Sequence, residues 1–184
     1  IDGNKFVVGV YGDDTGATNA GSAYLFDATT GALLQTFNNP TPEEYDHFGE
    51  HVSISGNKVL IGAAGDDGCC GFYNDHDNGS AYLFDATTGA LLHTFENPIS
   101  EWGDRFGNSV SISGDKVLIG EQNDSTIGGN YAGSAYLFDA TTGALLQTFN
   151  NLTEYDIFGH SVSIFGNNVL IGAPGCCGVS GVGD

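Results

Sequence analysis

The chain has 184 residues, of which 29 are Gly, and 23 Asp and Glu against 4 Lys and Arg give a formal net charge of −19. So few basic side chains exclude nucleic-acid binding, because phosphates would go unneutralised, and the excess of acid also argues against an anionic membrane surface. No run of 18 apolar residues occurs, so we expect no transmembrane helix and no membrane insertion.

Internal repeats organise the chain. The string AYLFDATTGALL occurs three times without change, at Ala23–Leu34, Ala81–Leu92 and Ala135–Leu146. The motif Phe-Gly-x-x-Val-Ser-Ile occurs at Phe48–Ile54, Phe106–Ile112 and Phe158–Ile164. A Val-Leu-Ile-Gly run follows at Val59–Gly62, Val117–Gly120 and Val169–Gly172, and Phe6–Gly9 resembles it. These spacings predict four copies of one unit, at residues 1–47, 48–105, 106–157 and 158–184.

The third copy shows the make-up of one unit. It holds four short apolar segments, at Ser109–Ile112, Lys116–Gly120, Ser134–Phe138 and Ala144–Phe149. A hairpin-type turn, Ser113-Gly114-Asp115, follows the first segment, and an Asp-initiated turn that closes on Gly143 follows the third. No stretch has a convincing helical period, and the segments are apolar on both faces. Four-stranded sheets stacked face to face, as in a β-propeller, bury both faces in this way.

In chain order the copies hold three, four, four and two of these segments, because the first lacks its first strand and the fourth stops after its second. We therefore predict an all-β, β-propeller-type array of four-stranded antiparallel blades, about three and a quarter in this chain. A closed propeller has 4 to 8 complete blades, so the exposed ends need a neighbour. The array continues in a longer chain, or several chains close a ring, or the ends pair head to tail into filaments.

The motifs resemble a known family. Phe-Gly at the start of each unit, and Gly-Ala-Pro at Gly172–Pro174, are similar to the FG-GAP repeat of integrin α-subunit propellers and of many secreted bacterial proteins. The resemblance covers essentially the whole chain and implies a propeller fold. The other copies depart from Gly-Ala-Pro. The Asp-x-Asp-x-Asp-Gly calcium loop of integrin-type units is replaced by Ser-Gly-Asn or Ser-Gly-Asp, so that site is not carried over.

Charge separates between the two ends of the strands. The loops between strands one and two and between strands three and four, which we call the Lys side, carry Asp2, Asp27, Asp85, Asp115 and Asp139 against Lys5, Lys58 and Lys116. The other loops and the connections between copies, which we call the acid side, carry Asp13, Asp14, Glu43, Glu44, Asp46, Asp66, Asp67, Asp75, Asp77, Glu101, Asp104, Glu121, Asp124, Glu154, Asp156 and Asp184 against Arg105.

The acid-side loops also vary in length, as binding loops on a repeated scaffold do. Oxygen-rich, flexible clusters suit Ca²⁺, which takes 6–8 oxygen ligands. The candidate calcium ligands are Asp13, Asp14, Asp46, Asp66, Asp67, Asp75, Asp77, Asp104, Asp124 and Asp156. The alternative is that these acids only keep an extracellular protein soluble.

Cysteine usage and glycosylation motifs indicate an extracellular or cell-surface protein. Four Cys form two adjacent pairs, at Cys69, Cys70, Cys176 and Cys177. An even count favours disulfides, across loops or between chains, over zinc, because no Cys-x-x-Cys spacing occurs. Acceptor triplets for N-glycosylation lie at Asn78, Asn123 and Asn151. The chain has no Met and no leader, so we expect a processed product or a piece of a longer protein.

The sequence does not predict an enzyme. The five His residues show no ligand spacing, and no nucleophile–base motif is present. We expect instead an extracellular structural or adhesive repeat module, self-assembling or continued in a longer repeat chain, with a cation-binding acid side. The alternative is a calcium-dependent propeller domain that binds a glycan or a cell-surface protein.

Overall fold

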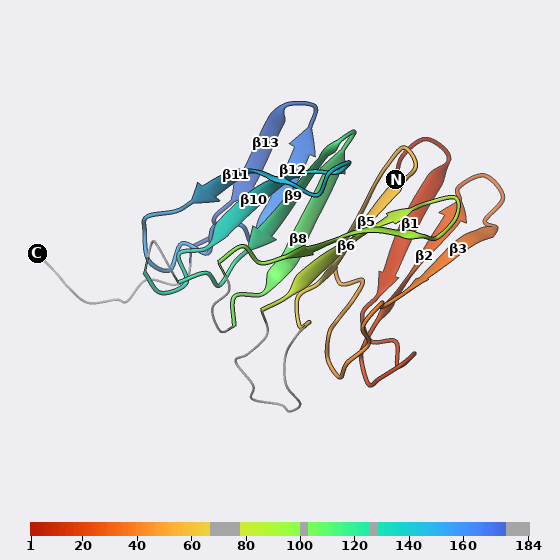
Figure 1. The fold of residues 1–184 in the computed structure, drawn as a ribbon, viewed down its shortest axis with the longest axis horizontal. Coiled ribbons are helices and arrows are strands. Elements are labelled where there is room, and N and C mark those ends of the chain that lie inside the picture. The colour runs from red at the N-terminus through yellow and green to blue at the C-terminus, as the bar shows by residue number, and fades with distance from the viewer. Residues whose placement is uncertain (67–77, 100–102, 126–128, 176–184) are drawn as a thin grey trace, which may run out of the picture.

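The structure is a computed structural model that describes residues 1–66, 78–99, 103–125 and 129–175. In these residues it has thirteen strands in four antiparallel sheets, and each sheet follows chain order. Figure 1 shows the sheets side by side in a row. We call them blades 1 to 4. The all-β prediction and the pattern of three, four, four and two strands are confirmed.

The strand bounds are as follows. Blade 1 contains β1 (Lys5–Val10), β2 (Ser22–Asp27) and β3 (Leu33–Asn38). Blade 2 contains β4 (Val52–Ser55), β5 (Lys58–Ala63), β6 (Ser80–Asp85) and β7 (Leu91–Glu96). Blade 3 contains β8 (Phe106–Ser113), β9 (Lys116–Glu121), β10 (Ser134–Asp139) and β11 (Leu145–Asn150). Blade 4 contains β12 (Ser161–Phe165) and β13 (Asn168–Gly172).

The turns on the Lys side use the residues that the sequence assigns to them. Ser113 pairs with Lys116, which leaves a two-residue loop, and its first residue, Gly114, has a φ of 59°, as a type II′ hairpin requires. After β10, the Asp139 carboxylate accepts hydrogen bonds from the backbone N–H of Thr141 at 2.9 Å and of Thr142 at 2.7 Å. The same bonds form after β2 and β6. The predicted Asp-initiated turn is therefore present in three blades.

The Phe-Gly dipeptide joins each blade to the blade before it. The backbone N–H of Phe106 donates to the Asn78 carbonyl of blade 2 at 2.9 Å, while its ring packs on Phe138 of blade 3, 6.1 Å between centroids. Gly107 follows with a φ of 88°. A Cβ on Gly107 would overlap the Ser80 carbonyl oxygen, so the two backbones meet at a distance that only glycine permits.

The same arrangement occurs at the other two junctions. Phe48 N–H donates to the Ala20 carbonyl at 3.1 Å, and Phe158 N–H donates to the Ala132 carbonyl at 2.9 Å. Gly49 and Gly159 have φ values of 92° and 83°. We call the Phe-Gly dipeptide and its contacts with the preceding blade the Phe-Gly latch. It explains why this motif recurs once in each copy from the second onward.

Three apolar clusters fill the spaces between neighbouring blades. Phe37 of β3 packs on Phe84 of β6, and Phe95 of β7 packs on Phe138 of β10, with centroids 5.2 and 4.9 Å apart. A third cluster around Leu118 and Ile164 lies between blades 3 and 4. Each blade therefore buries one face against the next, as the two-sided apolar segments predict. A search of the described residues for a helix of membrane-spanning length and hydropathy finds none.

The latch predicts a large difference between two glycine substitutions. Gly114→Ala places a side chain in open space at positive φ, so it should cost about 1 kcal/mol of unfolding free energy. Gly107→Ala adds an overlap with the blade 2 backbone and should cost more than about 3 kcal/mol, measured by urea denaturation. Equal losses in the two variants would contradict the latch.

Candidate functional site

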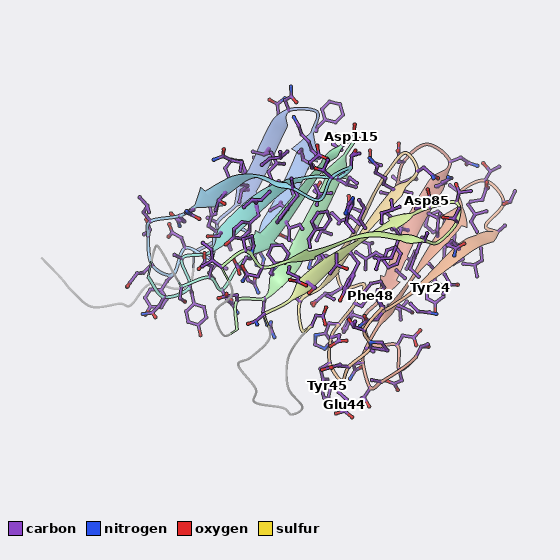
Figure 2. All side chains as sticks on the ribbon, viewed as in Figure 1. Tyr24, Glu44, Tyr45, Phe48, Asp85 and Asp115 are labelled. Atoms are coloured by element: carbon purple, nitrogen blue, oxygen red, sulfur yellow. The ribbon has the colours of Figure 1, made fainter. Side chains whose placement is uncertain are left out.

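The two loop sides lie at opposite ends of the blades. Figure 2 shows Glu44 and Tyr45 at one end and Asp85 and Asp115 at the other. Of the predicted calcium ligands, the structure describes Asp13, Asp14, Asp46, Asp66, Asp104, Asp124 and Asp156. Asp67, Asp75 and Asp77 lie outside the described residues, as do all four Cys. The described candidates fall into two rows that repeat from blade to blade, with Asp14 outside both.

The first row consists of Asp46, Asp104 and Asp156, each two residues before the Phe of a Phe-Gly latch. Each of its carboxylates accepts a hydrogen bond from an Asn amide that follows the last strand of the preceding blade. The pairs are Asn39–Asp46 at 2.6 Å, Asn97–Asp104 at 2.8 Å and Asn151–Asp156 at 2.9 Å. The backbone carbonyl of the same Asp accepts from the next loop, as from Gly65 to Asp46 at 3.1 Å. This row therefore fastens the connection between two blades.

The second row consists of Asp13, Asp66 and Asp124, which lie in the loops that follow β1, β5 and β9. Asp13, Asp66 and Asp124 each accept the N–H of the Gly before the next strand on their backbone carbonyl, at 2.9, 3.1 and 3.0 Å. Their carboxylates accept hydroxyl donors: Ser22 at 2.7 Å and Tyr24 at 3.0 Å for Asp13, Tyr82 for Asp66, and Ser134 for Asp124. Hydrogen bonds from Thr15, and then from Ser22, hold the pKa of Asp13 well below its usual range.

The two rows meet within the protein, where four of their members are buried. Asp46 is fully buried, and Asp66, Asp104 and Asp124 expose 2%, 1% and 4% of their surface. Burial raises the pKa of Asp46 to about 7, and the nearby charge of Asp66 contributes. One carboxylate oxygen of Asp46 has no hydrogen-bond partner among the described residues. These acids lie beneath the loops, whereas Asp14, Glu43, Glu44 and Glu154 remain exposed.

Glu121 is a buried acid whose environment the sequence did not predict, since it was counted only among the acid-side charges. It is the last residue of β9, is fully buried and occupies the place that Ala63 takes in β5. The Asn97 amide donates to Glu121 and to Asp104, so this amide bridges two carboxylates. Burial first, and then the charge of Asp104, raise the pKa of Glu121 to about 10. This raised pKa favours the protonated, neutral form of the Glu121 carboxyl at pH 7.

A search for clustered metal-binding side chains covers only the described part of the chain. Within residues 1–66, 78–99, 103–125 and 129–175, no group of three or more His, Cys, Asp or Glu side chains is placed to hold a metal ion. Each carboxylate of the two rows accepts at least one hydrogen bond from a hydroxyl or amide donor of the protein, although one oxygen of Asp46 has no partner among the described residues. Calcium binding therefore stays a prediction, for the candidates described here as for Asp67, Asp75 and Asp77 outside the described residues.

Two of the three predicted glycosylation sites use their side chains within the fold. The Asn151 amide makes the bond to Asp156 described above, and the Asn123 amide donates to the Gly103 carbonyl at 3.0 Å. The Asn78 side-chain oxygen is buried and has no hydrogen-bond partner in the described part of the chain. A glycan on Asn123 or Asn151 would replace one of the amide hydrogens available for these bonds.

Glu121 predicts a specific pH dependence of stability. Its pKa is raised from 4.5 to about 10 by folding, so the folded chain binds more protons than the unfolded chain between these values. The unfolding free energy should then fall as pH rises, by up to about 1.4 kcal/mol per pH unit from this group. Glu121→Gln should reduce that slope, and exposed Glu154→Gln should not, in urea denaturation at about pH 5, 7 and 9. Identical slopes in the wild type and in Glu121→Gln would show that Glu121 is ionised.

Three comparisons place the chain among known proteins. The FG-GAP repeat family model matches residues 42–84 and 100–138, which confirms the resemblance seen in the sequence. The crystal structure of the computationally designed Ika8 protein matches with a TM-score of 0.57 at 19% identity. The match covers 94% of this chain and 41% of the designed chain, and it confirms the propeller-type fold. A search of curated proteins finds no significant match.

Proposed function

Because residues 42–84 and 100–138 are FG-GAP repeats, we propose that this chain is a non-enzymatic structural or adhesive module of an extracellular protein. In this role it holds successive blades in one fixed arrangement and presents the exposed acids of the acid side to its surroundings. The fixed arrangement is the observation that carries the proposal. The same backbone bonds of the Phe-Gly latch recur at all three junctions between blades.

Serine side chains of the first strands supply a second set of these contacts. The N–H of Ile112 donates to Ser53 Oγ at 3.2 Å, and the N–H of Ile164 donates to Ser111 Oγ at 3.1 Å. Two residues further along, the turn glycines make the same kind of bond. The N–H of Gly114 donates to Ser55 Oγ and the N–H of Gly166 donates to Ser113 Oγ, both at 3.1 Å. With the Phe-Gly latch, these bonds fix the spacing and rotation of blades 2, 3 and 4. Such regularity suits a scaffold.

The acids of the two rows also support a role without catalysis. Asp46, Asp104 and Asp156 hold the connections between blades, and Asp13, Asp66 and Asp124 hold the loops, so their carboxylates already have protein partners. What remains for a ligand on the described acid side is its exposed layer. That layer includes Asp14, Glu43, Glu44 and Glu154 and the rings of Tyr11 and Tyr131, which are 55% and 49% exposed.

The exposed rings favour one alternative function. Tyrosine faces beside carboxylates suit the stacking of a sugar ring, so a calcium-dependent carbohydrate- or protein-binding module is the competing proposal. The two proposals differ in what calcium does. A scaffold keeps its shape with or without calcium, whereas a calcium-dependent binding module gains affinity for its ligand when calcium is present.

Small-angle scattering and a glycan array together test the proposed function. For a scaffold we expect the same scattering curve in calcium and in chelator at low protein concentration, with no glycan retained in either buffer. The array should be repeated with Tyr131→Ala, and with Phe165→Ala as a control that changes an exposed ring away from the acid side. Glycan binding that needs calcium and Tyr131, but not Phe165, would overturn the scaffold in favour of the binding module.

A further inference from the structure

The turns of the Lys side are alike in length from blade to blade. Two residues separate the first two strands of blades 2, 3 and 4, as between Ser113 and Lys116. The turn that begins after Asp139 and ends before Leu145 has the same length in blades 1 and 2. All residues of these turns belong to the described part of the chain. Because the turns match, blades 1 to 3 end at the same level and form an even surface.

The last strand of blades 1, 2 and 3 starts at this surface with two exposed leucines. Each of the six exposes between 41% and 53% of its surface, and we call them the leucine row: Leu33, Leu34, Leu91, Leu92, Leu145 and Leu146. A β-bulge at each pair interrupts the regular alternation of side chains. In blade 2 the register shifts between His93 and Leu91, so Leu92 has no partner residue in β6. The same shift occurs in blades 1 and 3.

A neighbouring blade does not cover the leucine row. Blade 2 has four strands and lies between two other blades, yet Leu91 and Leu92 are 44% and 41% exposed. Leu145 of blade 3 has almost the same exposure, 45%. The row is therefore a property of the repeat itself, in which the leucines end the string AYLFDATTGALL in all three copies.

The charges of the Lys side suit contact with a second copy of the same surface. Three of the four basic residues of the chain lie here, beside five Asp. Lys58 forms an ion pair with Asp115 at 2.6 Å, whereas Lys116 forms none within the described residues. Asp27 and Asp85 also form none there, and backbone hydrogen bonds from the turn threonines lower their pKa, so both are ionised at pH 7. Each Lys side therefore offers both signs of charge to another.

The acid side does not share this balance. Its exposed acids in the described residues include Asp14, Glu43, Glu44 and Glu154, and Arg105 is the basic residue that the sequence places there. Two chains of net charge −19 therefore approach with least repulsion through their Lys sides. The mixed charge of the Lys side also gives no preference for a strongly acidic or strongly basic partner. A second copy fits this surface better than either.

We propose that two copies of this chain pair Lys side to Lys side, with one leucine row against the other. Both copies use the same surface, so the contact is isologous and closes at two chains. Removal of the leucine rows from water would drive the pairing, and the charges would favour one orientation. The pairing rests on the proposed function, because it leaves both acid sides facing outward, where a structural or adhesive module presents them.

Sedimentation velocity of the whole chain, from micromolar to millimolar concentration, tests the pairing. We expect the mean mass to rise to twice that of the monomer and no further. The double variant Leu91→Asp, Leu92→Asp should raise the dissociation constant more than about tenfold, because it places charges within the leucine row. The matched control, Ile99→Asp with Leu152→Asp, adds the same charge at exposed acid-side residues and should leave the dissociation constant unchanged. Far-ultraviolet circular dichroism checks folding, and Leu33→Asp with Leu34→Asp replaces the first variant if that variant is unfolded.

Hydrogen exchange of the wild type shows which surface the contact covers. Higher concentration should slow exchange in the Lys-side turns at residues 28–32, 86–90 and 140–144, and not in the acid-side connection at residues 151–156. The pairing is overturned if the wild type stays monomeric, if its mass grows beyond a dimer, if the leucine variant associates as the wild type does, or if the acid side gains the protection. These outcomes leave the proposed scaffold intact, whereas calcium-dependent glycan binding overturns the scaffold whether or not the chain pairs.

Discussion

The structure depends on the approach of one glycine backbone to the backbone of the blade before it. Gly107 lies so close to Gly62 and Ser80 that no side chain fits at Gly107 or at Gly62. This proximity lets Phe95 and Phe138 meet across the junction at 4.9 Å. Aromatic packing between blades and the glycine contact therefore require each other, and neither would form with blades set further apart.

The latch also determines what the acidic residues do. Asp46, Asp104 and Asp156 each lie two residues before the Phe of a latch, so docking of the latch places them at the connection between two blades. Asp46 and Asp104 are buried there. There they meet Asn amides instead of water. These carboxylates, which the sequence assigns to the acid side, therefore form hydrogen bonds that hold the connections between blades. The exposed layer of the acid side is the part left for the partners that we propose.

The strands and turns were predictable from the sequence because their signals are local. Gly114 and Asp139 each fix a turn through their own backbone or side chain, and two such turns per copy set the number of strands. The buried acids were not predictable, because their burial depends on the neighbouring blade. Glu121 sits at a strand position where another copy has Ala63, and nothing in its immediate sequence shows that Asn97 and Asp104 close over it. The Phe-Gly motif was visible, but its contact with the preceding blade needed the structure.

Hydrogen exchange at the amides of Phe48, Phe106 and Phe158 tests the latch most directly. Each of these amides donates to a carbonyl of the blade before it, so its exchange requires that two blades separate. If the latch joins the blades, these amides should exchange as slowly as those at the centres of β5 and β9. Exchange as fast as that of the exposed turn at Gly31 would show that the blades part readily, and would contradict the account.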